Sequence, residues 1–214
     1  MLTLHGFDFS VFVNKVRYLA HHGGIEYTYN QLDPRQGELS AEAHLQRHPA
    51  GKVPAIEDDG CVLFESNAIM KYLARKHDLS VYPKGITEQA LVDQWLDFVS
   101  IHVGNAMNRV FINRFAFRLF DIEFDERSLQ DGLKFLERFL PVVDKQLKHT
   151  GYVVGDGLTI ADFNLIAVTD PFELAEVDIT SYPNLKSFRD RMTAEDFYQK
   201  CFKAYSDCFS VEAG

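Results

Sequence analysis

The chain is organised around Gly51-Lys52-Val53-Pro54-Ala55 and around Phe64-Glu65-Ser66-Asn67-Ala68-Ile69, which follows it closely. The first segment predicts a turn into a short strand. Its proline cannot donate to a ladder, so it marks a bend that can contain a cis peptide bond. Residues 56–63 lie between the two segments and predict a hairpin, because two short apolar runs flank an acidic turn. The second segment predicts the start of a helix.

The predicted helix start has the features of an anion-binding site. The first turn of a helix leaves N–H groups unpaired and carries a positive partial charge. Such a terminus can hold a carboxylate, to which Ser66 adds a hydroxyl, while Glu65 can face a cation. This pair predicts a ligand that carries both an amine and a carboxylate. The alternative is that Glu65 and Ser66 serve only as helix caps.

The segments that precede this motif predict a βαβ unit. A short apolar strand begins at the N-terminus, and Ser10 precedes a helix with apolar residues at one face. Gly23-Gly24 ends that helix, and residues 25–30 alternate as a strand does. A short helix is predicted within 39–47 and another over 65–77. The first 77 residues therefore predict the order β-α-β-α-β-β-α.

Every element after this region is predicted to be helical. We expect one domain over residues 1–78, a linker over 79–87 and a helical domain over 88–214. Long helices are expected over 87–119 and 125–148, and Pro141 is expected to kink or split the second one. Thr159 and Asp162 form a capping box at the start of an apolar, buried helix. Two further helices are expected from residue 182 and over 197–205.

Composition narrows the classes of function. The 214 residues carry a net charge of −9, which argues against nucleic acid and against an anionic membrane surface as partners. No apolar run is long enough to span a membrane, and the N-terminus lacks a signal peptide's basic start. Cys61, Cys201 and Cys208 form neither a disulfide framework nor a metal spacing, so we expect a reducing cytoplasm and no metal site.

Three motifs resemble the cytosolic glutathione transferase superfamily over nearly the whole chain. They are Lys52-Val53-Pro54, Glu65-Ser66-Asn67-Ala68-Ile69 and the segment from Gly155 to Phe163, which contains the capping box. Each motif alone is weak evidence for this family, but the three motifs in this order and at this spacing are strong evidence. The resemblance implies a thioredoxin-like N-terminal domain, an all-helical C-terminal domain, glutathione as co-substrate and a homodimer.

The resemblance also implies how each residue of the motif meets glutathione. Pro54 would be the family's cis-proline, presenting the backbone of Val53 to the cysteinyl part of the ligand. Glu65 and Ser66 would hold the γ-glutamyl ammonium and carboxylate. Lys52 would pair with the glycyl carboxylate, and Ser40 lies where members of the family often place another glycyl contact.

The catalytic residue implied by the resemblance is Ser10. The serine-type pattern of the theta-like and phi-like classes places a serine at the start of the first helix. A hydroxyl hydrogen bond and a helix N-terminus both favour the thiolate of glutathione. The alternative is that Ser10 only caps the helix, which is the commonest role of serine at this position. The chain departs from the pattern after Ser10, where Val11-Phe12 replaces proline or a small residue.

The second substrate is expected to be a small apolar electrophile, as in detoxification. The resemblance implies a pocket lined by Phe12 and by the helical-domain residues Met107, Phe111 and Phe115, although the last three could equally be ordinary core. Conjugation of glutathione is the expected reaction. A glutathione-dependent peroxidase on the same fold and a non-catalytic binding protein remain the alternatives, because a fold does not fix a function.

Overall fold

The computed structural model of the chain describes residues 1–118, 120 and 122–202. The chain divides into two compact units. The first unit comprises Met1–Leu79 and the described residues from Glu195 onward, and the second comprises Ser80–Ala194. This division differs at the C-terminal end from the expected helical domain over 88–214, because the last described helix belongs to the first unit. The first boundary lies at the start of the expected linker.

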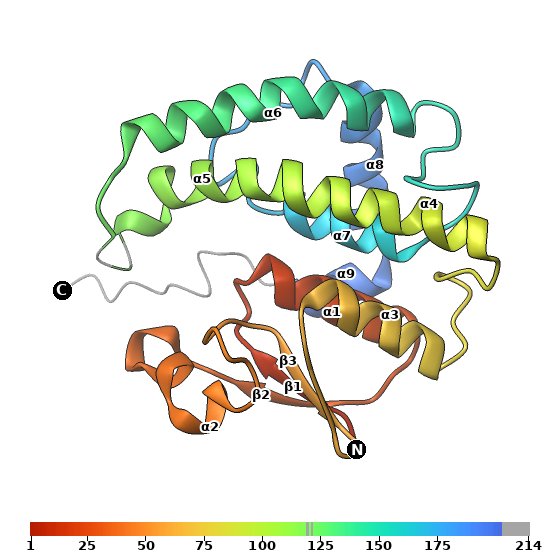
Figure 1. The fold of residues 1–214 in the computed structure, drawn as a ribbon. Coiled ribbons are helices and arrows are strands. Elements are labelled where there is room, and N and C mark those ends of the chain that lie inside the picture. The colour runs from red at the N-terminus through yellow and green to blue at the C-terminus, as the bar shows by residue number, and fades with distance from the viewer. Residues whose placement is uncertain (119, 121, 203–214) are drawn as a thin grey trace. The chain divides into compact units, whose positions relative to one another are not determined.

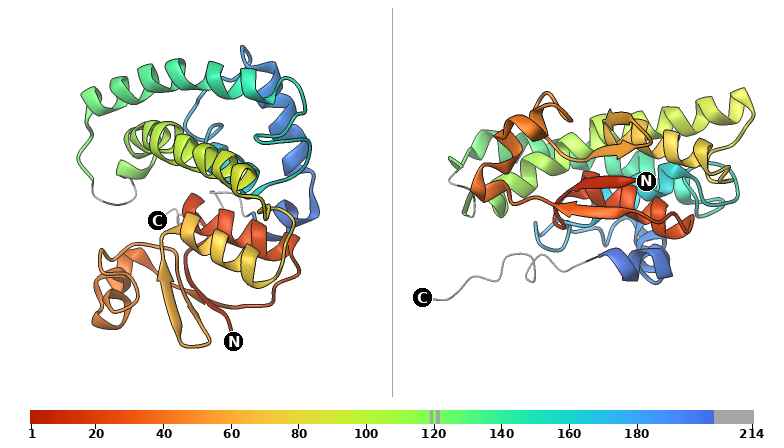
Figure 2. Two further views of the ribbon diagram at one scale, coloured as in Figure 1. Left: turned by 45° about the vertical axis from the view of Figure 1, so that its right-hand side comes forward. Right: turned by 90° about the horizontal axis from the view of Figure 1, so that it is seen from below.

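The first unit is built on a four-stranded mixed sheet in the order β2-β1-β3-β4. The parallel pair β1 and β2 is the predicted βαβ unit, and the pairs β1–β3 and β3–β4 are antiparallel. The helices α1 and α3 lie on one side of this sheet (Figure 1), and Figure 2 shows the strands from below. The elements of this part are β1 (Thr3–Gly6), α1 (Val11–His22), β2 (Thr28–Gln31), η1 (Pro34–Gln36), η2 (Glu38–Ser40), α2 (Glu42–Leu45), β3 (Ala55–Asp58), β4 (Cys61–Phe64) and α3 (Ser66–Lys76).

The last described helix, α9 (Asp196–Cys201), completes the first unit by packing on α1. Tyr18 of α1 is fully buried, and its ring stacks on that of Tyr198 at 5.2 Å between centroids. The ring of Phe197 lies 5.9 Å from Tyr18. Burying a side chain of this size stabilises a fold by roughly 1.5–3 kcal/mol. The helix predicted over 197–205 begins one residue earlier and ends at Cys201, and residues 203–205 lie outside the described part of the chain.

The second unit is helical, and together the two units confirm the predicted fold class. The long helix predicted over 87–119 is interrupted by a π-helical turn and ends at Arg114. Pro141 does not split the following helix, which continues to Leu147. The elements are α4 (Ile86–Asp97), η3 (Phe98–Gly104), α5 (Asn105–Arg114), η4 (Ala116–Arg118), α6 (Glu126–Leu147), α7 (Ile160–Thr169) and α8 (Pro183–Thr193).

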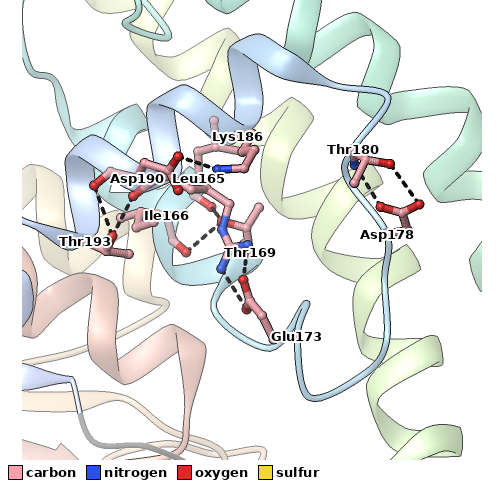
Figure 3. Close-up of polar contacts among 10 residues, drawn as sticks. Leu165, Ile166, Thr169, Glu173, Asp178, Thr180, Lys186, Asp190 and Thr193 are labelled. Carbon is pink, nitrogen blue, oxygen red and sulfur yellow. Dashed lines mark hydrogen bonds and ion pairs between the residues drawn. The ribbon is translucent and has the colours of Figure 1, made fainter.

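The helix α7 forms the centre of the second unit, and all ten of its residues are buried. The capping box at its start is present as predicted. The Asp162 carboxylate accepts hydrogen bonds at 2.8 Å from the N–H and the hydroxyl of Thr159. At its other end, the Thr169 hydroxyl donates to the carbonyls of Leu165 and Ile166, as Figure 3 shows. The buried hydroxyl of Thr169 therefore has its partners within α7 itself.

The helix α8 is tied to the segment after α7 by a charged contact. Arg189 is 6% exposed and donates two hydrogen bonds to the Glu173 carboxylate, at 2.6 and 2.9 Å. The Arg189 contact lowers the pKa of Glu173, and it does so against the opposing effect of burial, which is the largest single influence. A bidentate pair of this kind fixes orientation as well as adding energy. It holds the loop after α7 against α8.

Candidate glutathione-binding site

The strand register brings three separate segments to one edge of the sheet. Ala55 of β3 pairs with His5 of β1 on one side and with Phe64 of β4 on the other. Pro54, which precedes Ala55, therefore lies at the same edge as Glu65, which follows Phe64. The loop that leads from β1 to Ser10 leaves the sheet at this edge too. The predicted recognition motif and the predicted catalytic serine thus share one end of the sheet.

The peptide bond between Val53 and Pro54 is cis, as the motif predicted. The segment before it is fixed by His44, a buried residue of α2 whose Nε2 lies 2.9 Å from the carbonyl oxygen of Lys52. Because a carbonyl only accepts hydrogen bonds, this nitrogen carries the proton and donates. Val53 remains half-buried and the Lys52 side chain is exposed. The backbone of this segment is therefore held in place by the buried His44.

Ser40 directly follows Leu39, whose backbone lies close to Gly51 of the motif. Gly51 has a φ of +59°, and a Cβ added there would lie 2.8 Å from the carbonyl oxygen of Leu39. Only glycine combines this backbone conformation with such a close approach. The contact brings the turn that contains Ser40 against the residue before Lys52. The side chains of Ser40 and Lys52 are both exposed.

The start of α3 has an unusual backbone. Glu65 is its N-cap residue and has φ 69° and ψ 105°, a backbone conformation that residues other than glycine rarely adopt. Among the described residues, Glu65 makes no side-chain hydrogen bond to the first turn of α3. Ser66 follows as the first helical residue and is 6% exposed. The Glu65 side chain therefore does not cap α3.

Ser10 is the N-cap of α1, and its geometry allows both roles considered for it. Its Oγ accepts a hydrogen bond from the N–H of Val13 at 3.4 Å, and the residue is 8% exposed. A hydroxyl carries one donor and two acceptor sites, so accepting from Val13 leaves the hydroxyl proton to donate. Capping and donation to a ligand sulfur are therefore compatible in one side chain.

A buried lysine that the sequence reasoning missed lies beside the helix start. Lys15 of α1 is 1% exposed, and its Nζ donates to Oδ1 of Asn67 at 2.6 Å. Burial lowers the pKa of Lys15 to about 7, although the charge of Glu65 acts in the opposite direction. A signal was available in the sequence. Lys15 occupies the same helical stripe as Phe12 and Leu19, where a charged residue is unexpected.

A buried histidine lies near the same helix start. His48 is 4% exposed, and its ring centroid is 4.9 Å from that of Phe64. Its Nδ1 accepts a hydrogen bond from the N–H of Ala50 at 3.3 Å. Burial lowers the pKa of His48, whereas the negative charge of Glu65 opposes that change. Glu65 is thus an acidic group that acts on both Lys15 and His48.

The four residues expected to line the electrophile pocket differ in exposure and in whether they line a cavity. Phe12 is 37% exposed, and Met107 is 2% exposed and so belongs to the core. Phe111 lies with its ring 5.5 Å from that of Phe115. Phe115 alone of these four lines a cavity of about 620 Å³ within the second unit. The other side chains around that cavity are Asn113, Arg114, Phe117, Arg118, Phe124, Leu174 and Glu176.

Within residues 1–118, 120 and 122–202, no group of three His, Cys, Asp or Glu side chains is arranged to hold a metal ion. No helix in the same part of the chain has the length and apolar character needed to cross a membrane.

Comparisons with known proteins agree on one family. Residues 1–75 match the model of the glutathione S-transferase N-terminal domain, and residues 94–196 match that of the C-terminal domain. A probable glutathione S-transferase, GSTF2, of Oryza sativa subsp. japonica is 31% identical over 204 residues, covering 93% of this chain and 94% of that protein. Glutathione S-transferase 1 of Zea mays is 30% identical over 183 residues, covering 83% and 84%.

A solved structure gives the same result in three dimensions. The theta-class glutathione S-transferase of Xanthomonas axonopodis pv. citri, determined with glutathione bound, superimposes with a TM-score of 0.84. The two sequences are 25% identical, and the match covers 95% of this chain and 97% of that one.

Proposed function

The chain belongs to the glutathione S-transferase family and is a glutathione transferase, and on this basis we propose how its residues bind glutathione and act on it. The observation that carries the proposal is the sheet register, in which Ala55 is paired on both sides. That register sets the cis-proline segment beside the start of α3. Glutathione would lie along this edge of the sheet.

Each part of glutathione has a matching group at this edge. The backbone N–H and C=O of Val53 would pair with the cysteinyl residue as an added antiparallel strand does. The γ-glutamyl carboxylate would accept from the first N–H groups of α3 and from Ser66, and Glu65 would face the ammonium. The exposed Lys52 and Ser40 would contact the glycyl carboxylate. An exposed ion pair of this kind contributes about 1 kcal/mol or less.

The chemical step that we propose is nucleophilic attack by the glutathione sulfur. Ser10 would donate its hydroxyl proton in a hydrogen bond to the sulfur, favouring the thiolate of a group whose ordinary pKa is about 8.5. The thiol proton passes to solvent. The thiolate then forms a carbon–sulfur bond with the electrophile, and the leaving group departs with the electron pair of the bond that breaks.

Substitution of Ser10 tests this step and separates it from capping. In an N-cap position alanine costs about 1 kcal/mol of stability, whereas glycine costs only a few tenths. We expect Ser10→Ala and Ser10→Gly to lose conjugation of glutathione to an aryl halide equally, by about 10- to 1,000-fold in kcat. Glutathione binding should be retained in both. Wild-type activity in Ser10→Gly would show that only the cap matters.

We further propose that the electrophile is small and apolar and meets aromatic side chains of the helical unit. The cavity lined by Phe115 supports this, since Phe117 and Phe124 line it too. Phe12 and Phe111 stay predicted contacts of the electrophile, each on its own unit, whereas the buried Met107 belongs to the core. Phe115→Ala should raise KM for the aryl halide and leave KM for glutathione unchanged. An unchanged KM for the halide would remove Phe115 from the pocket.

We also propose that the protein is a cytoplasmic homodimer. Exposed apolar side chains on β4, Val62 at 47% and Phe64 at 40%, support a protein contact at that strand. Sedimentation of wild type and Val62→Glu checks the dimer, because a charge buried in an interface weakens it. The free thiols of Cys61 and Cys201 support a reducing compartment, which imaging of the tagged chain checks.

A further inference from the structure

A lysine side chain is buried inside the first unit. Lys15 is 1% exposed and is among the largest fully buried side chains of the chain. Transferring an ammonium group out of water is unfavourable by several kcal/mol unless partners compensate. Methionine or leucine would fill this position of the helical stripe without that cost. The lysine therefore calls for an explanation in terms of what its nitrogen contacts.

The contacts of Lys15 lead to the start of α3. Its Nζ donates to Oδ1 of Asn67 at 2.6 Å, and Asn67 directly follows Ser66. The same nitrogen lies 5.5 Å from the centre of the Phe12 ring. Phe12 and Asn67, which lies beside the proposed γ-glutamyl site, thus meet at one nitrogen. The lysine connects the first turn of α1 to the first turn of α3.

Two further cationic groups on α1 and α9 have ion-pair partners of their own. Arg17 of the same helix pairs with Asp8 at 2.8 Å. On α9, which packs against α1, Lys200 pairs with Asp196 at 3.5 Å. On the α3 side, Glu65 is the acidic group that acts on Lys15, and it also acts on His48. A carboxylate arriving at the start of α3 would be a second negative charge on the same side.

We propose that Lys15 is a positioning residue of the glutathione site, and that it takes up a proton when the γ-glutamyl carboxylate of the ligand binds at the start of α3. This inference rests on the proposed function. Without ligand, burial holds the pKa of Lys15 at about 7, so that near neutral pH the amine and the ammonium coexist. An opposite charge close by favours the charged form, typically by one unit or more. The bound carboxylate therefore selects the ammonium form.

The uptake of a proton has a measurable size. If the ligand raises the pKa from about 7 to about 8, roughly half a proton is taken up per site at pH 7.5. The same change makes the Kd rise by roughly tenfold between pH 6 and pH 9. A lysine that served only to fill space would give neither effect. The readout is thus specific for a change in protonation.

The experiment is calorimetric titration with S-methylglutathione, which has no thiol to ionise, in buffers of different ionisation enthalpy at pH 7.5. We expect the wild-type binding enthalpy to vary with the buffer and to give roughly half a proton taken up. Lys15→Arg keeps a permanent charge, because arginine stays protonated, and should bind without uptake. Lys15→Met should bind more weakly, also without uptake. His48→Gln is the matched control and should retain the uptake.

The outcomes separate this inference from the proposed function. Failure of wild type to bind S-methylglutathione overturns the proposed function and the inference with it. Binding with the same enthalpy in every buffer overturns the inference alone and needs no variant. Uptake that persists in Lys15→Arg, or that disappears in His48→Gln, assigns the proton to another group and overturns it as well.

Discussion

Single residues in this protein carry functional features that a stability-optimised chain would lack, and Glu65 is the clearest of them. Its φ of 69° and ψ of 105° lie in a region that disfavours every residue with a Cβ. Such a conformation is unfavourable by roughly 1–3 kcal/mol. Glycine would relieve it but would remove the carboxylate that the proposed site needs.

We therefore predict opposite effects of Glu65→Gly on stability and on binding. The free energy of unfolding should stay the same or rise by up to about 2 kcal/mol, since relieved strain outweighs the added freedom of the unfolded chain. Glutathione binding should weaken by tenfold or more. Denaturant unfolding and calorimetry measure the two quantities. Glu65→Gln, which keeps the strain and removes the charge, is the control and should lose binding without gaining stability.

At the scale of the helix, the start of α7 places a carboxylate where water does not reach. Asp162 is fully buried, and its carboxylate accepts hydrogen bonds from Thr159 and from the N–H of Val153 at 2.8 Å. Burial nevertheless dominates and raises the pKa of Asp162 to about 6 from its ordinary 3.8. The folded state therefore holds this proton more tightly than the unfolded state does. Stability from this group is complete below pH 4 and is lost as the pH rises through 6.

Comparison of wild type with Asp162→Asn isolates that effect. Asparagine cannot accept every one of these hydrogen bonds, because its amide nitrogen is a donor, so the variant should be less stable at every pH. The stability gap should be wider at pH 4.5 than at pH 7.5 by about 2 kcal/mol. Denaturant unfolding at the two pH values measures the gap. A gap that widens towards pH 7.5 would contradict the raised pKa.

The contact between α5 and α6 depends on a glycine inside a helix. A Cβ at Gly132 would lie 2.9 Å from the carbonyl oxygen of Ala106 and 2.9 Å from Cβ of Arg109. Alanine normally favours a helix over glycine by about 1 kcal/mol. Here we predict the reverse, with Gly132→Ala lowering the free energy of unfolding by about 1–3 kcal/mol. Gly157→Ala, where no atom lies within 4 Å of the added Cβ, should change it little.

For the molecule as a whole, the N-terminal elements and the last described helix belong to one compact unit. The contact of α9 with α1 buries Phe197 and Tyr198, which are 4% and 6% exposed. A chain ending at Ala194 lacks this contact. We predict that its α1 amides exchange with solvent at least tenfold faster, because their protection depends on packing. Fluorescence of Trp95, in the second unit, should remain as in wild type. Unchanged α1 exchange would show that α9 is dispensable.

A point substitution checks the same contact without shortening the chain. Phe197→Ala should lower the free energy of unfolding by about 3–5 kcal/mol, as truncation of a buried phenylalanine does. Lys200→Ala on the same helix is the control, since the side chain of Lys200 is 62% exposed. Equal stability of the two variants would argue against the packing role of α9.

Much of this architecture follows from patterns that act over short distances. The hairpin after Pro54, the helix after Ser10 and the capping box at Thr159 each depend on neighbours within a few residues, and all three are present in the structure. The cis-proline and the paired Glu65-Ser66 could be placed because they lie on either side of one hairpin. The register of that hairpin then determines the edge of the candidate site.

The features that sequence reasoning missed depend on contacts between distant segments. The π-helical turn at Phe98–Gly104 accompanies a buried amide of α7, since Asn164 donates to the carbonyl of Leu96 at 3.2 Å. No local sequence pattern around Leu96 predicts a partner as distant in the chain as Asn164. The association of α9 with α1 likewise joins residues far apart in the chain. Pro141 leaves α6 unbroken because packing against α5 outweighs one missing hydrogen bond.

The packing of α9 on α1 also determines the order in which the two units are completed during synthesis. The ribosome makes the strands of the first unit before the helical unit, but it makes the helix that covers Tyr18 only after that unit. At about 5–20 residues per second, the Ser80–Ala194 stretch takes roughly 6 to 23 s to synthesise. Throughout that interval the apolar surface of α1 lacks its cover. Synthesis of the helical unit therefore begins after that of the first unit but is completed before it.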